Sequence, residues 1–579
     1  MIKTLKQTTT LLAIQTVMLG LLPITALAAT FRLESATISD IDAAFDSGAL
    51  TSKELVQLYL NRIAAYDKLG PGLNSLIAVN PNALQEAEAL DAQRQLKKPT
   101  SPLYGIPVIL KDNYDTSDLP TTAGALALKG FIPSDNAFQV QKLRDAGAIV
   151  LGKANLSEFA FSFSTVSSLG GTTLNPYDTR RTPGGSSGGT GAAIAANFGA
   201  VGLGTDTGGS IRIPATFNSL VGVRPTIGLS SRSGIIPLAL SQDVGGPLTR
   251  TVRDAALALD ATVGNDPKDP VTASSIGKIP ASYTDSLKVD GLKGSRIGVV
   301  RDLFGLDADP GAAQTNAVVN QAIADIKSRG ADIVENVTIP NLDKILSYPS
   351  LSSYEFKFNL NNYLSEHPNA PVHSLQDIID SGGYLTSNKD TLIVRNSRQS
   401  LANDPTYQDI IKNRPVITQQ AILSALNENH LDALLYPTST NPPALLTENQ
   451  NTGSANRLSP YSGFPEISVP AGYTTDGLPV GFSLLGEAFS EPTLLKLAYS
   501  YEQGTMLHRP PESTPALEGE VFEYDEVPEP SATIGLTAVA LVAISLKLKR
   551  RRQVSFAFAP DVIPVLTTEE TLKETEVGY

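Results

Sequence analysis

Apolar residues follow a helical spacing in the first part of this chain. They recur on one face between Leu55 and Ile63, directly after Thr51 and Glu54, which are spaced as in the capping box of a helix N-terminus. A second helix is predicted over residues 81–96. Neither segment carries residues with evident chemistry, so we interpret both as packing elements.

Short apolar runs alternate with further helical stretches over the rest of the chain, a pattern typical of an α/β protein. The pattern loosens over residues 342–400, where Tyr, Phe and Asn are frequent. This region fits either a substrate wall, with residues 354–363 as the candidate, or a plain helical insertion. Strands are predicted at 108–110, 148–151, 200–203, 295–300, 331–334, 433–436, 467–471 and 480–485, and helices at 137–146, 192–196, 251–263, 314–329 and 418–429.

The composition narrows the class of protein. Of the 579 residues, 41% are hydrophobic and 18% are charged, which is typical of a globular chain. The formal net charge of −13 speaks against a nucleic-acid-binding protein, which would carry a basic patch. The chain has 0 cysteines, and this excludes disulfides, thiolate metal sites and a cysteine nucleophile.

The N-terminus has the three parts of a secretory signal peptide. Lys3 and Lys6 supply a positive start, residues 11–22 are mostly apolar, and residues 26–28 (Ala-Leu-Ala) fit the small-x-small cleavage pattern. We therefore predict a signal peptide over residues 1–28 and a mature, exported protein that begins near Ala29.

Two Gly-Ser clusters bracket the stretch from Pro183 to Pro214. The first covers residues 184–189, and the second, Gly208-Gly209-Ser210, follows a predicted strand. Glycine allows a backbone to approach a ligand closely and to aim N–H groups at it, so we expect a serine nucleophile here. The four histidines, which are the usual bases for serine, all lie far away in sequence, at positions 367, 373, 430 and 508.

Two well-known sequence motifs match this chain in residue spacing, but the residues in and around them do not fit the structures that these motifs require. Gly147 to Lys153 fits the spacing of a phosphate-binding P-loop, but its four inner residues form an apolar strand and Ala154 stands where Ser or Thr would bind magnesium. Gly184 to Gly188 fits the nucleophile elbow of α/β-hydrolases, but polar residues and Pro183 precede it instead of a buried strand. We reject both interpretations.

Lys111 follows the apolar strand at residues 108–110 directly. Burying an ammonium group is costly, so the side chain either extends to the surface along its apolar stem or stays buried for a chemical reason. Taken alone, its position favours the first alternative.

The sequence resembles the amidase signature family in three motifs. They are GIPVILKDN at residues 105–113, GGSSGG at 184–189 and GTDTGGSIRIP at 204–214, and Ser186 and Ser210 lie 24 residues apart. The resemblance extends over about residues 35–510. It implies one large α/β/α domain, here residues 29–520, with a mixed twisted central sheet covered by helices.

The resemblance also implies a catalytic triad and an amidase activity without metal or organic cofactor. Ser210 would be the nucleophile, Ser186 would follow a cis peptide bond and relay a proton, and Lys111 would be the base. That assignment is physically coherent because burial lowers the pKa of a lysine toward the neutral form that accepts protons, and a hydroxyl can donate and accept at once. The further expected residues are the anion-hole N–H groups of Thr207, Gly208 and Gly209, with Asp206, Arg212 and Ser187 in support.

Two other functions remain open on the sequence. Some members of the family are amidotransferase subunits that pass ammonia to a partner protein and act on tRNA. A second alternative is a non-catalytic binding protein anchored at the cell surface.

The C-terminus resembles a PEP-CTERM sorting signal of exported bacterial proteins. Val527-Pro528-Glu529-Pro530-Ser531 precedes the apolar run 532–546, and the basic residues 547–552 follow. We place this segment at residues 521–552, before a tail at residues 553–579, and it implies membrane anchoring and a sorting protease as a partner.

Overall fold

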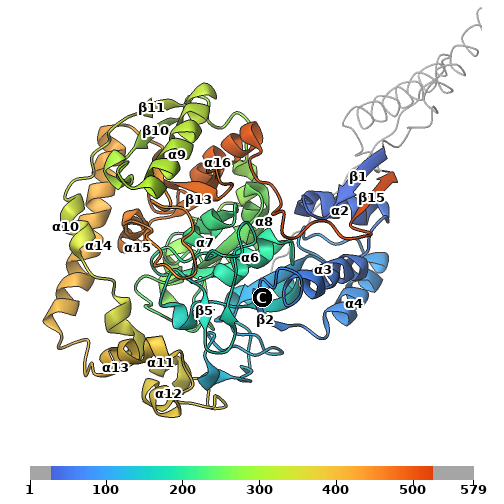
Figure 1. The fold of residues 1–579 in the computed structure, drawn as a ribbon, viewed down its shortest axis with the longest axis horizontal. Helices are drawn as coiled ribbons and strands as arrows, with labels where there is room; N and C mark the ends of the chain where they lie inside the picture. Colours follow the sequence, from blue (N-terminus) through green and yellow to red (C-terminus); the bar gives the residue numbers. More distant parts are fainter. Residues whose placement is uncertain (1–27, 526–579) are drawn as a thin grey trace, which may run out of the picture. The chain divides into compact units, whose positions relative to one another are not determined.

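A mixed β-sheet of 11 strands forms the centre of the structure, a computed structural model that describes residues 28–525 (Figure 1). Its strand order is β11-β10-β12-β14-β13-β8-β9-β7-β3-β4-β2. The pairs β7-β3, β3-β4, β10-β11 and β10-β12 are parallel, and the others are antiparallel. The strands are β2 (Leu76–Val79), β3 (Pro107–Lys111), β4 (Ile149–Ala154), β7 (Val201–Asp206), β8 (Val221–Arg224), β9 (Val244–Thr249), β10 (Arg296–Val299), β11 (Asp332–Val334), β12 (Ala433–Pro437), β13 (Glu466–Tyr473) and β14 (Pro479–Leu485).

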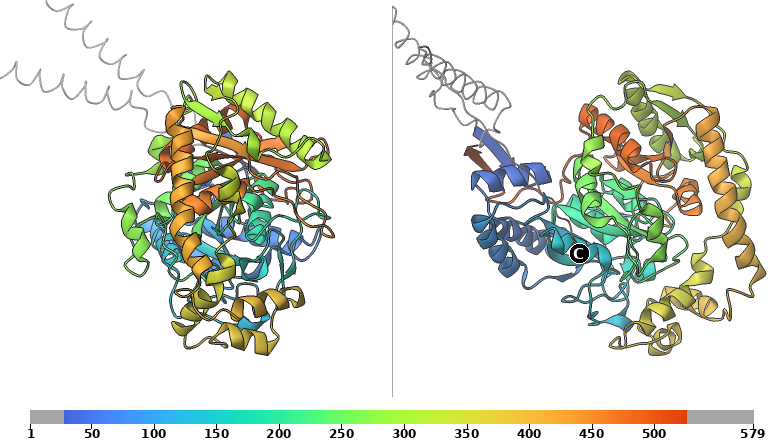
Figure 2. Two further views of the ribbon diagram at one scale, coloured as in Figure 1. Left: turned by 90° about the vertical axis from the view of Figure 1, so that its left-hand side faces the viewer. Right: turned by 180° about the vertical axis from the view of Figure 1, so that it is seen from behind.

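Helices cover both faces of this sheet, so the α/β/α architecture expected from the sequence is confirmed (Figure 2). The helices are α2 (Ile38–Ser47), α3 (Ser52–Tyr66), α4 (Ala83–Leu96), α5 (Phe138–Asp145), α6 (Gly188–Ala195), α7 (Arg212–Phe217), α8 (Val252–Thr262), α9 (Pro310–Ser328), α10 (Leu342–Ser347), α11 (Ser352–Ser365), α12 (Leu375–Ser381), α13 (Lys389–Asn396), α14 (Pro405–Glu428), α15 (Leu458–Ser462) and α16 (Glu491–Thr505).

The alternation of side chains in β7 shows how the two layers are separated. Val201 and Leu203 face an apolar core that includes residues of α5 and α8. Gly202 lies on the other face, where an added Cβ atom would come within 2.5 Å of the Thr190 side chain of α6. The glycine therefore lets α6 approach the strand closely and brings the start of this helix beside the end of β7.

The parallel pairing of β3 with β7 positions the site. Val108 pairs with Val201 and Leu110 with Leu203, so the carboxyl ends of both strands lie at the same edge of the sheet. Ligands of open α/β sheets bind beyond the carboxyl ends of parallel strands. Lys111 ends β3 and Asp206 ends β7, which places the motifs around both residues at this edge.

Most of the predicted elements are present, and the Thr51–Glu54 capping box at the start of α3 is confirmed. Strand β9 was not predicted, because Gly245, Gly246 and Pro247 interrupt its apolar pattern although all of its residues are buried. The predicted start of α14 at residue 418 is also wrong. The helix begins at Pro405 and continues through Pro415, a residue that usually ends helices because it lacks an N–H group.

Residues 342–400 form helices α10 to α13, as the helical-insertion alternative had it. Helices α11, α12 and α13 pack against one another (Figure 1). Their apolar side chains, among them Phe356 and Leu392, share a core with Ala123, Leu128 and Phe159 of the loops beside β3 and β4. The insertion is thus anchored to the region that carries the site.

Two further strands join the ends of the described chain. β1 (Ala28–Arg32) pairs antiparallel with β15 (Val521–Asp525), and Phe31 stacks on Phe522 with ring centroids 4.9 Å apart. The predicted signal peptide up to residue 27, the sorting segment from residue 526 and the tail at 553–579 lie outside the described residues. Within residues 28–525, no helix has both the length and the apolar character needed to cross a membrane.

Candidate active site

Ser210 lines a cavity of about 240 Å³. It belongs to the Gly208-Gly209-Ser210 turn that connects β7 to α7, and 5% of its surface is exposed. Gly209 has a φ of +134°, a backbone conformation that residues with a Cβ atom rarely adopt. The turn therefore presents one hydroxyl group to the cavity on a short, tightly bent backbone.

The first Gly-Ser cluster lies directly beside this turn. The Gly185–Ser186 peptide bond is cis, as the resemblance implies. The N–H of Ser187 donates to the carbonyl of Ser210 over 3.3 Å, so a backbone hydrogen bond connects the two clusters. Ser186 is fully buried, and the fold thus brings together the two serines that the sequence separates by 24 residues.

Lys111 is buried completely, so the surface-seeking alternative for this side chain is wrong. Its Nζ lies 2.7 Å from Ser186 Oγ and 2.7 Å from Thr205 Oγ1. Burial lowers the pKa of the Lys111 ammonium to about 7, although the negative charges of Asp206 and Asp243 oppose the shift. An appreciable fraction of the side chain is therefore a neutral amine near pH 7, in contact with the Ser186 hydroxyl.

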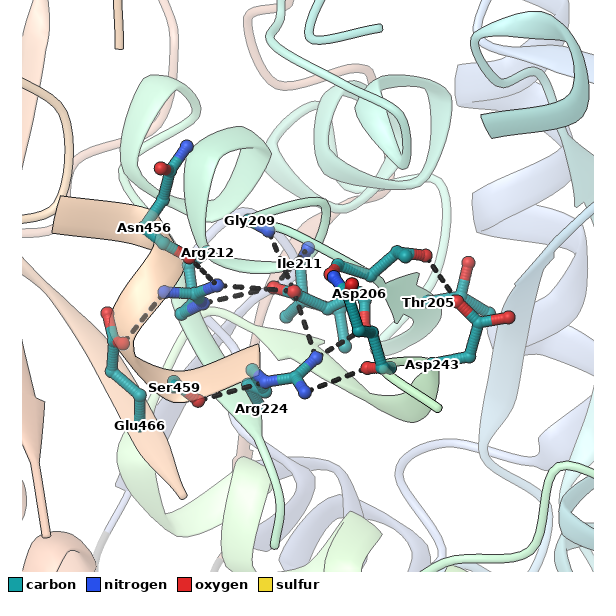
Figure 3. A network of polar contacts seen from close by, with 12 residues as sticks. Thr205, Asp206, Gly209, Ile211, Arg212, Arg224, Asp243, Asn456, Ser459 and Glu466 are labelled. Carbon is teal, nitrogen blue, oxygen red and sulfur yellow. Dashed lines mark hydrogen bonds and ion pairs between the residues drawn. The ribbon is translucent and has the colours of Figure 1, made fainter. Parts of the chain in front are cut away.

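A buried network of charges holds the turn from below (Figure 3). Arg212 donates to both carboxylate oxygens of Asp206, over 3.0 and 3.2 Å, and to Glu466 over 2.7 Å. Arg224 also contacts Asp206, with 3.1 Å between Nη1 and Oδ1. The two arginines keep the pKa of Asp206 far below its usual range despite its burial. The predicted Asp206–Arg212 pair is thus one part of a larger network that fixes the turn.

Two carbonyl groups of the turn are held by side chains. Arg224 donates to the carbonyl of Asp206, and Gln242 Nε2 donates to that of Thr207 over 2.8 Å. In a trans peptide the N–H points away from the carbonyl. The N–H groups of Thr207 and Gly208 therefore point away from the two side chains that hold these carbonyls. Thr207, Gly208 and Gln242 all line the cavity.

One of the predicted anion-hole residues needs a correction. The N–H of Gly209 donates to Asp206 Oδ1 over 2.7 Å, so this donor serves the turn itself. The strong acceptor three residues earlier, a buried carboxylate, outcompetes a neutral ligand for this N–H group. Thr207 and Gly208, which line the cavity, remain as the expected anion-hole donors.

Comparison with known proteins identifies the family. Residues 54–495 match the family model described as Amidase. The chain belongs to the amidase family. It is 38% identical to a probable amidase from Arabidopsis thaliana, over 84% of this chain and 93% of that protein. It is 36% identical to a glutamyl-tRNA(Gln) amidotransferase subunit from Thermoanaerobacter pseudethanolicus, over 83% and 99% of the two chains.

The solved structures agree with this assignment. The native peptide amidase from Stenotrophomonas maltophilia matches with a TM-score of 0.76 and 39% identity, over 83% of this chain and 98% of that one. The resemblance to the amidase signature family that the three motifs indicated is therefore confirmed, together with the fold. The protein is an amide hydrolase.

The amidase site contains functional residues that sequence reasoning missed. Thr205 contacts the Lys111 amine, Gln242 and Arg224 hold the turn, and Glu466 pairs with Arg212. A signal was available for Arg224 and Glu466, since charged residues at the ends of otherwise apolar strands are seldom buried without partners. Nothing in the sequence distinguishes Gln242 from a surface glutamine.

Ser187 supports the amidase site without facing the cavity. Its hydroxyl donates to the carbonyl of Thr205 over 3.2 Å and accepts from the N–H of the same residue over 3.3 Å. It therefore connects the start of α6 to the end of β7.

Lys153, the lysine of the rejected P-loop pattern, lies in β4. It pairs with Asp112 at 3.3 Å and donates to the carbonyl of Tyr114.

Loops, helix α15 and the start of α11 form the cavity walls, and the predicted segment at residues 354–363 contributes no lining residue. Phe161 and Phe163 line one side, and Tyr461 of α15 lines another. Phe356 of α11 stands behind Phe161, with ring centroids 4.8 Å apart, and supports the wall without reaching the cavity. The remaining lining residues are Ala160, Ser162, Leu238, Gln242, Ser350, Ser352, Gly453, Asn456, Arg457 and Pro460.

Proposed function

We propose that this amidase hydrolyses a carboxamide through Ser210, with Ser186 as proton relay and Lys111 as base. The observation that supports the proposal best is the 2.7 Å contact between the buried Lys111 amine and Ser186, directly beside the Ser210 turn. A serine hydroxyl is a weak nucleophile until a neighbouring base takes its proton. A lysine with a pKa of about 7 is suited to that task near neutral pH.

The proposed reaction begins when Lys111 takes the Ser186 proton while Ser186 takes that of Ser210. Ser210 Oγ attacks the amide carbonyl carbon, and the N–H groups of Thr207 and Gly208 stabilise the negative oxygen of the tetrahedral intermediate. The C–N bond then breaks, the proton returns through Ser186 to the leaving nitrogen, and ammonia or an amine departs. Water attacks the acyl-enzyme by the same relay and releases the carboxylic acid and Ser210.

We propose a peptide-like carboxamide with a terminal –CONH₂ group as the substrate class. Support comes from the 39% identity to a peptide amidase over nearly its full length. The alternative, an amidotransferase subunit, has support in the 36% identity to a subunit of that kind. The predicted signal peptide speaks against it, since tRNA is a cytosolic partner.

The first prediction is that the purified protein releases ammonia from N-acetylated peptide amides without any partner. Ammonia is measured with a coupled enzyme assay, and the peptide acid is identified by mass spectrometry. L-glutamine, the ammonia donor expected for an amidotransferase subunit, serves as the comparison. Release from glutamine but not from any peptide amide would overturn the hydrolase proposal in favour of the amidotransferase.

We further propose that the protein is exported and that its C-terminal segment at residues 521–552 is a sorting signal read by a membrane protease. Support comes from the sequence of both terminal segments, in which the parts of a signal peptide and of a sorting signal follow one another in the expected order. We expect N-terminal sequencing of the protein purified from the cell envelope to begin at Ala29. A cytosolic protein that retains Met1 and the residues after it would contradict the proposal.

A further inference from the structure

Three arginines surround the substrate cavity. Arg457 lines it directly, and its Nη1 donates to the carbonyl of Leu346 over 2.6 Å. The other two arginines each pack against an aromatic ring of the cavity wall. The Cζ atom of Arg395 lies 3.9 Å from the ring centroid of Phe161, and the Cζ atom of Arg414 lies 4.0 Å from the ring centroid of Tyr461. Both rings line the cavity, so the three positive charges approach it from two sides.

Arg395 and Arg414 are buried, whereas Arg457 is exposed. Within residues 28–525, none of the three has a carboxylate oxygen within 4.0 Å. Arg62 and Arg212, by contrast, each pair with a buried carboxylate at 2.7 Å. The buried Arg250 also forms no ion pair within residues 28–525 and donates to backbone carbonyls instead, so it is their position at the cavity that distinguishes the three arginines.

Arg395 is buried against aromatic side chains. Only 9% of its surface is exposed, its Nη1 has no hydrogen-bond partner, and burial lowers the pKa of the guanidinium to about 10. Phe161 lies on it, and Phe356 of α11 is the second ring beside it, at 5.3 Å. Contacts with aromatic faces offset a part of the desolvation cost of a cation, but less than a carboxylate would. The group remains charged at neutral pH and faces the cavity wall without a counter-ion.

Three buried carboxylates near the cavity accept hydrogen bonds from neutral groups. Asp243 accepts from the hydroxyl of the lining residue Thr207 and from the N–H groups of Leu238 and Ala239. Burial lowers the pKa of the Arg414 guanidinium, and Glu355 is one of the groups that oppose this shift. The oxygens of Glu355, however, accept from the N–H of Ser241 and the hydroxyl of Tyr407. Glu158, near Phe161 in sequence, accepts from two backbone N–H groups of other loops. Within residues 28–525, neither Arg395 nor Arg457 has a carboxylate partner, although Arg457 is exposed to solvent, and the residues that line the cavity include no aspartate or glutamate.

We propose that the carboxamide substrate carries a carboxylate on its acyl part, bound directly by Arg457 and attracted at longer range by Arg395. The proposal rests on the proposed amidase function and deepens it: the substrate class is an anionic carboxamide, such as a peptide amide with an acidic residue at its end. Arg457 has guanidinium N–H groups beyond the one that contacts Leu346, and these suit a carboxylate geometrically. A cationic amide is disfavoured in the same cavity by repulsion from all three arginines.

The experiment compares amides that differ only in charge. N-acetyl-glutamic α-amide and its γ-methyl ester form the first pair, and the aspartic analogues form the second. We expect kcat/KM to be at least tenfold higher for the acid than for the ester in each pair, and N-acetyl-lysine amide to be the poorest substrate. In R457M the ratio of acid to ester is expected to fall to between 1 and about 3, and in R395M to an intermediate value.

The ratio is measured within one preparation, so it does not depend on the fraction of folded enzyme. R301M is the matched control, since Arg301 pairs with Glu335 and does not line the cavity, and it should keep the wild-type ratio. If the esters are hydrolysed as fast as the acids, the charge proposal is wrong and the amidase function stands. If R457M keeps the full ratio, the assignment of Arg457 is wrong. If no amide of either pair is hydrolysed, the proposed function and this proposal both fail.

Discussion

Replacing Ser210 with alanine should lower kcat/KM for any amide substrate by about 10⁴-fold or more, because the acyl-enzyme can no longer form. A fluorophosphonate probe, which reacts with activated serines, should label the wild type and leave Ser210→Ala unlabelled. The turn should stay folded, since the charges that hold it, Asp206 with Arg212 and Arg224, do not involve the Ser210 hydroxyl.

Ser162→Ala is the matched control for this labelling experiment. Ser162 lines the same cavity, but its hydroxyl contacts only Ser157 and Ser164 and has no base beside it. We expect this variant to label like the wild type. Equal labelling of wild type and Ser210→Ala would show that another group is the nucleophile and would remove the basis of the proposed mechanism.

Replacing Lys111 with methionine should reduce kcat/KM by about 10³-fold, in the middle of the range for loss of a general base. Methionine fills a similar volume without the desolvation cost of an amine, so the midpoint of thermal unfolding should not fall. Activity within tenfold of the wild type in a stably folded variant would sink the assignment of Lys111 as the base.

The pH dependence follows from the same residue. The base must be neutral, and burial places the pKa of Lys111 at about 7. Below pH 7 the protonated fraction grows, so kcat/KM should fall about tenfold for each unit of pH decrease, and above pH 8 it should reach a plateau. In the methionine variant this inflection should vanish from the residual rate. A wild-type rate that falls as the pH rises through 7 would mean that the protonated lysine is required instead.

The three residues proposed to carry the chemistry could be predicted from the sequence because they lie in short motifs that resemble those of the amidase signature family. The apolar run at residues 108–110 by itself placed Lys111 at a strand end and favoured a side chain that reaches the surface. What these patterns do not show is the environment of each group. Lys111 is buried and not extended to the surface because Ser186 and Thr205, from two other segments, both contact its amine.

The anion hole shows the same limit. The glycines indicate where backbone N–H groups can be exposed, but they do not tell which N–H is free. That is decided by Asp206, which accepts from the N–H of Gly209, and by Arg224 and Gln242, which donate to the carbonyls of Asp206 and Thr207. Each of these contacts crosses between segments or reverses within a turn, so no local pattern encodes it.

By itself, the sequence of this protein determined the fold class, the strands that meet at the site and the three residues proposed to carry the chemistry, because periodicity and contiguous motifs depend on near neighbours along the chain. Only the tertiary structure decided the lowered pKa of Lys111, the backbone N–H groups that are available as anion-hole donors, and the three arginines at or behind the cavity wall. Burial and charge compensation depend on which distant groups come within a few ångströms. Arg395 is an ordinary helical residue in the sequence, and it is the fold that leaves it behind Phe161 without a carboxylate.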